Sequence, residues 1–311
     1  MQFSVIIPAK NEQENIGRCL DSILQVEWDP QQFEIIVVDN GSSDSTASIA
    51  RGMGALVLVQ PGLTVAALRN FGAARARGEL LAFMDADCTV AHSWLRQAAK
   101  YLDRDDIVCF GSPPGVPPGA TWVQRAWYQV RSKKVPLGET AWLESMNMFV
   151  RRDVFSRCHG FDEKLVSCED YDLSLRLQRV GKVFTDSGIV ALHFGEASNL
   201  SRFFRKELWR GLGNLKGVLH HGIKLSELPN VCLPMLHCIL LVLLLTALLL
   251  APRIDAGLLF AALALFLVWQ SLLLLLSYIK YYRGTLSHVV QIFVLLNVYY
   301  LARGVAMLRQ P

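Results

Sequence analysis

The chain has 311 residues, of which 52% are hydrophobic and 19% are charged, and its formal net charge is +4. Its charged share lies below the roughly 25% that is usual for soluble domains. This hydrophobic content excludes a disordered chain and a collagen-like one.

The positive charge is concentrated near the C-terminus. Residues 231–311 contain five basic side chains and the single acid Asp255, which together account for the whole net charge. Residues 1–230 therefore hold equal numbers of acidic and basic side chains. Such a balance excludes the strongly basic surface by which many proteins hold nucleic acid, so we expect no nucleic-acid partner. The seven cysteines include no closely spaced pair, so we predict neither a disulfide nor structural zinc.

Residues 1–230 alternate between strand and helix patterns. Short apolar runs predict strands at 4–8, 33–38, 55–59 and 80–84, and a further extended segment at 147–150. Apolar spacing and capping residues predict helices over 16–24, 43–50, 66–76, 122–131 and 170–180. Residues 111–119 are rich in proline and glycine and predict a loop. Alternating strands and helices are typical of a layered α/β domain with a largely parallel sheet.

Acidic side chains follow two of these strands. Asp39 comes after the second predicted strand, and Asp85 and Asp87 come after the fourth. In an open α/β sheet, ligands bind at the carboxyl ends of the strands. Two carboxylates two positions apart suit Mg²⁺ or Mn²⁺ held together with a diphosphate. Taken alone, the Asp-Ala-Asp triplet is also compatible with a turn before a helix over 92–102.

Four motifs together resemble the family 2 glycosyltransferases, whose catalytic domain has the GT-A fold. They are SVIIPAKNE at 4–12, IIVVDNGSSD at 35–44, RNFG at 69–72 and FMDAD at 83–87. Their order and spacing match the family over roughly residues 3–195. The resemblance implies a Rossmann-like α/β nucleotide-diphospho-sugar transferase domain with a nucleotide-sugar donor and a divalent metal, Mn²⁺ or Mg²⁺. A dication neutralises the charge that develops on a diphosphate leaving group, so the chemistry agrees.

The resemblance also implies roles for single residues around the donor. The residues that would line the nucleotide pocket are Pro8, Ala9, Asn11 and Glu12. Asp39 would hydrogen-bond the base, and Arg69 would lie near the base or the diphosphate. Read without the resemblance, Asp39 is a turn residue and Arg69 a surface cation of a helix. Asn11 and Glu12 would then simply begin a helix.

The implied metal site centres on Asp87, which would be the principal ligand bridging both phosphates. Asp85 would face the ribose or the metal. His193 follows the apolar run 189–192 and would complete the metal shell, as a histidine after the last core strand does in some GT-A enzymes. A histidine at a strand end is otherwise a structural residue.

Residues 168–176 resemble the family's Glu-Asp pair at the start of a helix. The resemblance implies that Asp170, with Glu169 beside it, is the general base that takes the proton of an acceptor hydroxyl. A single in-line displacement would then invert the anomeric configuration. The alternative is that both acids only complement the dipole at the N-terminus of the helix.

Three Leu-rich stretches predict membrane spans at about 231–251, 256–279 and 286–308. The third contains His288, Gln291, Asn297 and Arg303, so it either spans or lies in the interface or in a groove. Residues 201–228 include a basic and aromatic segment that is either an amphipathic helix beside the membrane or an ordinary packed helix. The predicted domains are therefore a catalytic domain at 1–228 and an α-helical transmembrane region at 229–311.

The charges beside these stretches predict their orientation. Lys216 and Lys224 precede the first stretch, and Lys280 and Arg283 follow the second, whereas the loop between them carries one arginine and one aspartate. The positive-inside rule then places the catalytic domain in the cytoplasm, at the inner (plasma) membrane.

The combined features predict a membrane-anchored inverting glycosyltransferase of glycan or polysaccharide synthesis. It would move a sugar from a nucleotide-diphosphate sugar, with UDP-sugars ahead of GDP-mannose, to a hydroxyl of a lipid-linked saccharide or another membrane-associated acceptor. Polyprenyl phosphate is the alternative acceptor. The chain has no Gln-X-X-Arg-Trp motif, which argues against processive synthesis.

Two other protein classes are weaker alternatives. A nucleotidyltransferase would be expected to begin with a glycine-rich phosphate loop, and residues 8–12 contain no glycine. A non-catalytic membrane scaffold would be expected to have lost Asp39, Asp87 or Asp170, and all three are present.

Overall fold

A computed structural model of the chain describes residues 1–131, 137–165, 167–212, 228–282 and 284–309. The chain divides into two compact units, one of Met1–Pro117 with Lys133–Gly195 and one of Pro118–Ser132 with Glu196–Pro311. The sequence places its boundary at residue 228 instead, and that boundary stays a prediction. Residues 213–227, with Lys216 and Lys224, lie outside the described residues, as does Arg283.

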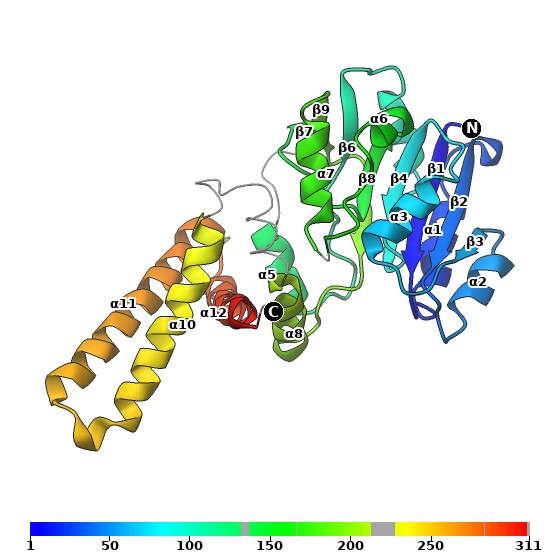
Figure 1. Cartoon of the computed structure of the whole chain (residues 1–311). Helices are drawn as coiled ribbons and strands as arrows, with labels where there is room; N and C mark the ends of the chain where they lie inside the picture. Colours follow the sequence, from blue (N-terminus) through cyan, green and yellow to red (C-terminus); the bar gives the residue numbers. More distant parts are fainter. Residues whose placement is uncertain (132–136, 166, 213–227, 283, 310–311) are drawn as a thin grey trace. The chain divides into compact units, whose positions relative to one another are not determined.

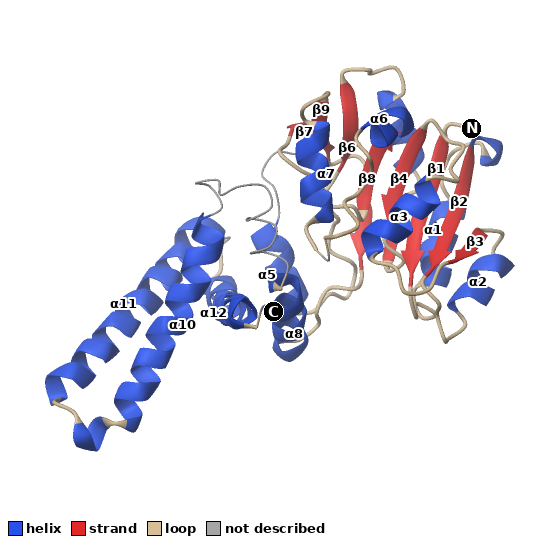
Figure 2. Cartoon of the chain, viewed as in Figure 1, coloured by secondary structure: helices blue, strands red, loops and turns tan. Residues whose placement is uncertain are grey.

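The first unit is built on an eight-stranded sheet with the strand order β3-β2-β1-β4-β8-β6-β9-β7 (Figure 2). Its strands are β1 (Phe3–Ala9), β2 (Phe33–Asp39), β3 (Leu56–Val59), β4 (Leu80–Met84), β6 (Ile107–Gly111), β7 (Leu137–Glu139), β8 (Asn147–Arg151) and β9 (Lys182–Asp186). Two further strands, β5 (Cys88–Val90) and β10 (Ala191–His193), pair with each other.

The helices of this unit connect the strands. They are α1 (Ile16–Leu24), α2 (Thr46–Gly52), α3 (Val65–Ala73), α4 (Trp94–Ala98), α6 (Arg152–Arg157) and α7 (Glu169–Leu177), with short 3₁₀ turns at Pro30–Gln32 and Ala99–Tyr101. The predicted strands at 4–8, 33–38 and 80–84 and the helix at 16–24 are confirmed. The helix predicted over 92–102 is shorter, because it breaks into α4 and the 3₁₀ turn.

The expected largely parallel sheet holds for one half only. The pairs β3–β2, β2–β1 and β1–β4 are parallel, whereas β8 runs antiparallel to both of its neighbours, β4 and β6. β7 is also antiparallel to β9. A largely parallel sheet was therefore the wrong prediction for the second half, and the sheet is mixed.

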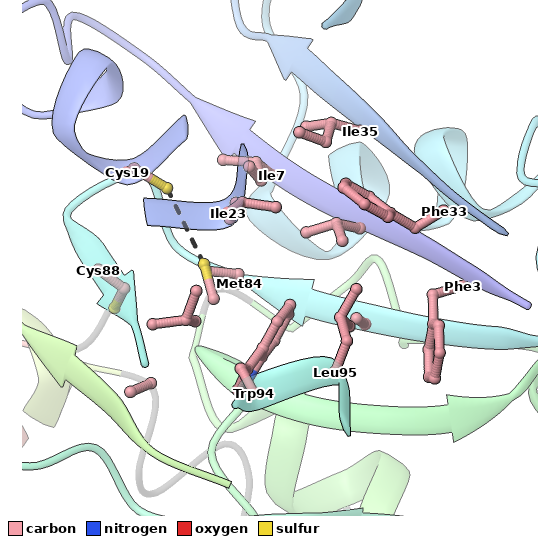
Figure 3. Packing of buried hydrophobic residues seen from close by; sticks show 14 of the residues in the cluster. Phe3, Ile7, Cys19, Ile23, Phe33, Ile35, Met84, Cys88, Trp94 and Leu95 are labelled. Atoms are coloured by element: carbon pink, nitrogen blue, oxygen red, sulfur yellow. Dashed lines mark hydrogen bonds between the residues drawn. The ribbon is translucent and has the colours of Figure 1, made fainter. Parts of the chain in front are cut away.

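The core lies on both faces of the sheet, and β1 explains why its sequence is continuously apolar. Val5 and Ile7 belong to the core cluster that contains Ile23 of α1, whereas Ile6 belongs to the opposite cluster with Leu68 of α3. Successive side chains of a strand point to opposite faces, so a strand covered on both sides has no polar alternation. Figure 3 shows the first cluster, in which Met84 lies against Cys19 and Leu95 lies between Trp94 and Phe3.

The second unit is helical. It contains α5 (Trp122–Arg131), α8 (Leu200–Gly211), α10 (Leu228–Leu249), α11 (Ala256–Tyr281) and α12 (Leu286–Leu308), with a 3₁₀ turn at Ala251–Arg253. The last three helices are long and apolar enough to cross a membrane. α10 and α11 form an antiparallel hairpin (Figure 1), in which Trp269 Nε1 donates to His237 Nδ1 at 2.9 Å. Their outer surface is apolar, and Leu249 is 81% exposed.

Candidate active site

Parallel pairing brings the ends of three strands to one edge of the sheet. Ala9 at the end of β1 lies opposite Asp39 at the end of β2, and β4, which ends just before Asp85, pairs with β1 on the other side. The side chains predicted from these three segments therefore gather at one edge, where α/β sheets bind ligands. Pro8 and Ala9 are the last two residues of β1, and both are buried at this edge.

Asp39 has an unused acceptor in the interior. Its side chain is 2% exposed, and its Oδ2 accepts a hydrogen bond from the backbone N–H of Ser42 at 3.0 Å. Its Oδ1 is buried and has no hydrogen-bond partner among the described residues. A buried acceptor without a partner is destabilising, so this oxygen is suited to receive an N–H group from a ligand.

Asn11 shapes the loop after β1 rather than beginning a helix. It has a left-handed backbone, with φ at 55°, which asparagine tolerates better than most residues. Its Oδ1 accepts from the backbone N–H of Ser43 at 2.9 Å, and its own N–H donates to Ser42 Oγ at 2.9 Å. These bonds fasten the loop after β1 to the loop after β2, next to Asp39.

Glu12 follows in the same loop, and α1 begins only at Ile16. Its backbone N–H donates to Thr46 Oγ1 at 2.7 Å, and its Oε2 accepts from Asn15 at 2.8 Å. Burial raises the pKa of Glu12, and the charges of Asp87 and Asp85 add to the rise, while the bond from Asn15 opposes it. Glu12 therefore lies within electrostatic reach of the two predicted metal carboxylates.

Arg69 joins the two halves of the site. The buried guanidinium donates through Nη2 to Asp85 Oδ1 at 2.7 Å and through Nη1 to Glu169 Oε1 at 2.8 Å. Burial alone would lower the pKa of Arg69, but Asp85 and Glu169 raise it above its ordinary value, so it stays charged. Arg69 is thus no surface cation of a helix. Its position near the base or the diphosphate stays a prediction.

Asp87 and His193 meet across the small β5–β10 sheet. His193 lies opposite Cys88, and its Nε2 is 3.2 Å from Asp87 Oδ2. One ligand atom each of Asp87, Cys88 and His193 lies within 4.8 Å of the others. Burial raises the pKa of the Cys88 thiol well above its usual range, and Mg²⁺ and Mn²⁺ favour carboxylate oxygen over thiol sulfur as a ligand.

Gly195 leaves room for the Asp87 carboxylate. A Cβ at this position would lie 1.7 Å from Asp87 Oδ2 and 3.1 Å from His193 Nε2. Carboxylate oxygen and imidazole nitrogen are donors that Mn²⁺ accepts. The residues present therefore fit a divalent metal at Asp87 and His193, with Asp85 two positions away on the same loop.

Glu169 and Asp170 are the first residues of α7. Arg69 bonds Glu169 through one guanidinium nitrogen and Asp85 through another. Asp170 accepts from the backbone N–H of Tyr171 at 2.8 Å and weakly from that of Ser145 at 3.4 Å, and it keeps part of its surface exposed. Burial, then the charges of Glu169 and Glu144, raise the pKa of Asp170 to about 7. A partly exposed carboxyl with this pKa is suited to exchange a proton near neutral pH.

Glu144 was not found from the sequence. It is buried and lies just before β8, and the antiparallel pairing of Asn147 with Met84 brings this segment to the edge where β4 ends. The sequence reading placed 147–150 as an extended segment but not its direction, so it could not bring Glu144 beside Asp170. The sequence signal was an acidic residue three positions before that segment.

Comparison with known proteins agrees with this geometry. The family model described as Glycosyl transferase family 2 matches residues 4–158. The glycosyltransferase AglE of Haloferax volcanii is 28% identical over 223 residues, which cover 68% of this chain and 73% of AglE. A beta-monoglucosyldiacylglycerol synthase of Trichormus variabilis is 24% identical over 204 residues, which cover 56% of this chain and 40% of that protein.

Solved structures share the fold. The mannosyltransferase PcManGT from Pyrobaculum calidifontis, solved with GDP-Man and Mn²⁺, has a TM-score of 0.65 at 18% identity, covering 99% of this chain and 87% of that one. Residues 1–349 of TarS from S. aureus, in complex with UDP-GlcNAc, have a TM-score of 0.51 at 17% identity, covering 100% and 93%. With the matched family model, the named relatives and the GT-A architecture taken together, the chain belongs to glycosyltransferase family 2.

Proposed function

We propose that this glycosyltransferase is anchored in a membrane and transfers a sugar, with inversion, from a UDP-sugar to a hydroxyl group of a lipid-linked saccharide or another membrane-associated acceptor. The observation that carries the proposal is that Arg69 bonds both Asp85 and Glu169. Asp85 would belong to the donor side of the site, and Glu169, next to Asp170, to the acceptor side.

The donor side is argued from Asp39. Its buried Oδ1 is suited to accept the ring N–H of a nucleobase, which uracil carries at N3 and guanine at N1. The loop of Pro8, Ala9, Asn11 and Glu12 lies beside it and would line the same pocket. A uracil is the smaller occupant, and the UDP-GlcNAc complex of TarS supports a UDP-sugar. PcManGT was solved with GDP-Man, so GDP is the base to compare.

The metal would be held by Asp87 and His193, with Asp85 beside them. When bound, a divalent ion neutralises the charge that builds up on the departing diphosphate. The protein's own part is to fix the ligands. Gly195 leaves space for the Asp87 carboxylate, and the β5–β10 pairing brings His193 to 3.2 Å from it.

The acceptor side is argued from Asp170. An alcohol must lose its proton as it attacks the anomeric carbon, and a carboxylate with a pKa of about 7 is matched to take it near neutral pH. A phosphate acceptor is already ionised and gains little from such a base. The raised pKa of Asp170 therefore favours a hydroxyl over polyprenyl phosphate.

Two aromatic rings contact each other at the start of α7. Trp142 and Tyr171 are half-buried, and their ring centroids lie 6.1 Å apart in an edge-on arrangement. Tyr171 follows Asp170 directly in α7. The flat apolar faces of aromatic side chains suit the C–H face of a sugar ring, so this pair supports a saccharide as the acceptor.

The membrane anchoring is argued from α10 and α11. Their exposed surfaces are almost entirely Leu, Ile, Val and Phe. Exposing an apolar area of this size to water would be strongly unfavourable. Lys280 lies in the last turn of α11, near the beginning of α10. By the positive-inside rule, this cation supports a cytoplasmic position for the catalytic unit at the inner (plasma) membrane.

Calorimetric titration of the detergent-solubilised full chain with UDP and with GDP, each with and without Mn²⁺, tests the donor side. We expect Mn²⁺-dependent binding of UDP that is lost in the Asp87→Ala variant and kept in the matched control Asp103→Ala. The Asp103 side chain is exposed and precedes β6, at the sheet edge opposite the one where β4 ends. Binding of GDP alone would correct the donor, and binding of neither by folded protein would refute the donor site.

The acceptor is tested with the same protein and the bound donor. Transfer to a lipid-linked saccharide that depends on Asp170 is the expected result. Transfer to polyprenyl phosphate that survives Asp170→Asn would instead establish the phosphate as the acceptor, because that reaction needs no general base.

A further inference from the structure

The third apolar helix, α12, packs in a way that a membrane span does not. α12 begins at Leu286, only a few residues after α11 ends at Tyr281, so its first turn starts at the level at which α11 ends. Because α10 and α11 form an antiparallel hairpin, this is also the level at which α10 begins. A spanning α12 would then carry its last turns, around 303–308, at least 25 Å away to the other side of the membrane, at about 1.5 Å per residue.

The contacts of its last turns contradict that course. A Cβ on Gly304 would lie 2.7 Å from the carbonyl oxygen of Pro234 and 2.3 Å from Cys238 Sγ, so α12 and α10 touch closely there. Pro234 is only about 9 Å, and Cys238 about 15 Å, from the first residue of α10. The end of α12 therefore lies near the beginning of α10, on the side at which α12 also starts.

A buried ion pair points the same way. Arg303 of α12 donates to Glu207 Oε2 of α8 through Nε at 3.0 Å and through Nη2 at 2.8 Å. A Cβ on Gly211 would lie 2.5 Å from the Cβ of Ala306, so the two helices are in close contact. α8 also carries the exposed Arg202 and Arg205, charges that would be strongly disfavoured inside a bilayer.

α5 touches both the end of α11 and the end of α12. Gln129 Nε2 donates to the carbonyl oxygen of Tyr281 at 2.7 Å, and the Trp127 ring lies 5.6 Å from that of Tyr299. In a spanning α12, Tyr299 would be about 20 Å beyond Leu286 along the membrane normal. α5 has only ten residues, and Trp127 and Gln129 are two positions apart on it, about 3 Å along its axis. Figure 1 shows α12 almost end-on where α10 and α11 are seen lengthwise.

We infer that α12 is no third span but lies in the plane of the membrane, in the headgroup layer, where α12, α8 and α5 form one docking surface for an anionic lipid leaflet. Only α10 and α11 cross the apolar core. The inference rests on the membrane anchoring proposed above. It goes beyond that proposal because it assigns which helices cross and which surface meets the lipid headgroups.

The charges of this docking surface fit such a partner. In the described part of the unit the acids are Glu196, Glu207 and Asp255. Glu196 and Glu207 are buried in ion pairs with Arg131, Lys206, Arg210 and Arg303, and Asp255 lies at the tip of the hairpin. The exposed side chains around the base of the hairpin include the apolar Ile279, Leu286 and Leu308 together with a set of cations and aromatics: Arg202, Arg205, Trp209, Tyr278, Lys280, Tyr282 and Arg309. Basic and aromatic side chains are those that bind anionic headgroups at an interface.

The number of spans decides on which side of the membrane the C-terminus lies. With two spans the N-terminus and the C-terminus lie on the same side of the membrane, whereas with three spans they lie on opposite sides. The full chain is expressed with a protease-cleavable epitope tag either before Met1 or after Pro311, and a third version carries the tag in the hairpin tip beside Arg253. Sealed inside-out and right-side-out vesicles are then treated with the protease.

We expect the two terminal tags to be cleaved in the same vesicle orientation and the tip tag in the other. Cleavage of the C-terminal tag together with the tip tag would overturn the inference, because α12 would then span. Cleavage of all three tags in one orientation would overturn it as well, since no helix would cross. Washing the membranes with alkaline carbonate before the protease step tests the membrane anchoring separately. Release of the chain from the membranes in this wash would refute the anchoring itself.

Discussion

His193 Nε2 lies 3.2 Å from Asp87 Oδ2, although 106 residues separate the two side chains in the sequence. The pairing of β5 with β10 sets this approach, and the backbone of Gly195 passes directly beside the same carboxylate. The position of the Asp87 side chain is therefore set by one distant segment, residues 193–195.

The Gly195→Ala variant tests this arrangement. Its new methyl group would lie 1.7 Å from Asp87 Oδ2, so the carboxylate must move away from His193. Displacing a ligand's support commonly lowers metal affinity about 10–100-fold, and we expect a loss of that size in the Mn²⁺ dependence of UDP binding, measured by calorimetry. The control is Gly52→Ala, because nothing lies within 4 Å of its Cβ. An unchanged Mn²⁺ affinity in Gly195→Ala would place the metal elsewhere.

Replacing Asp170 separates chemistry from donor binding. We expect Asp170→Asn to lower kcat by about 10²–10⁴, the usual contribution of a general base, while the affinity for UDP stays within about twofold. Steady-state kinetics and calorimetry on the same preparation measure the two quantities. A variant that keeps full kcat would show that another group takes the proton.

The pH dependence of the reaction follows from the pKa of Asp170. A base must be deprotonated, so kcat/KM should rise with pH through about 7 and then level off. Glu144 raises this pKa by its negative charge, so Glu144→Gln should move the rising limb to lower pH. Glu139→Gln is the matched control, because Glu139 is exposed on β7 and forms its ion pair with Lys182. Equal profiles for all three proteins would exclude Glu144 from the site.

The same carboxyl should make the fold less stable at high pH. The pKa of Asp170 is about 7 in the folded chain against 3.8 ordinarily, so the unfolded chain loses this proton first and stability falls between about pH 4 and pH 7. Asp170→Asn removes the charge, and we expect its Tm to exceed that of the parent by a few degrees at pH 8 and to equal it near pH 4. Thermal unfolding in detergent at both pH values checks this. A lower Tm at pH 8 would contradict it.

Arg69 should be among the most sensitive positions for stability. Arg69→Met leaves Asp85 and Glu169 without their shared cation, and breaking a buried ion pair on one side costs about 3–5 kcal/mol. For a unit of this size that corresponds to a Tm lower by roughly 10 °C. Arg157→Met is the control, because its ion pair with Asp153 is largely exposed and contributes about 1 kcal/mol or less. Similar losses in both variants would mean that Arg69 is not a buried ion-pair centre.

Part of this architecture could be predicted from the sequence. The continuous apolar runs of β1, β2 and β4 are the pattern of strands covered on both faces, and their order places Asp39 and Asp85 at one edge. The three apolar helices could be located by length alone. These features are local, because each depends on a run of adjacent residues.

Features that depend on the direction of pairing could not be predicted. The sequence indicated an extended segment at 147–150, but an isolated apolar run carries no information on whether its neighbours run with it or against it. The antiparallel course of β8 brings Glu144 and Ser145 to Asp170. Arg69 could be associated with the donor, but its bond to Glu169, 100 residues away, is visible only in the folded chain.

The shared guanidinium of Arg69 also bears on how this enzyme can change over evolution. Asp85 and Glu169 share one cation, so replacing Arg69 leaves two carboxylates without it, whereas replacing either acid leaves Arg69 paired with the other one. A new sugar specificity that requires replacing Glu169 would therefore leave the pair of Arg69 with Asp85 in place. Among relatives of this chain, Asp85 and Glu169 should each vary more freely than Arg69.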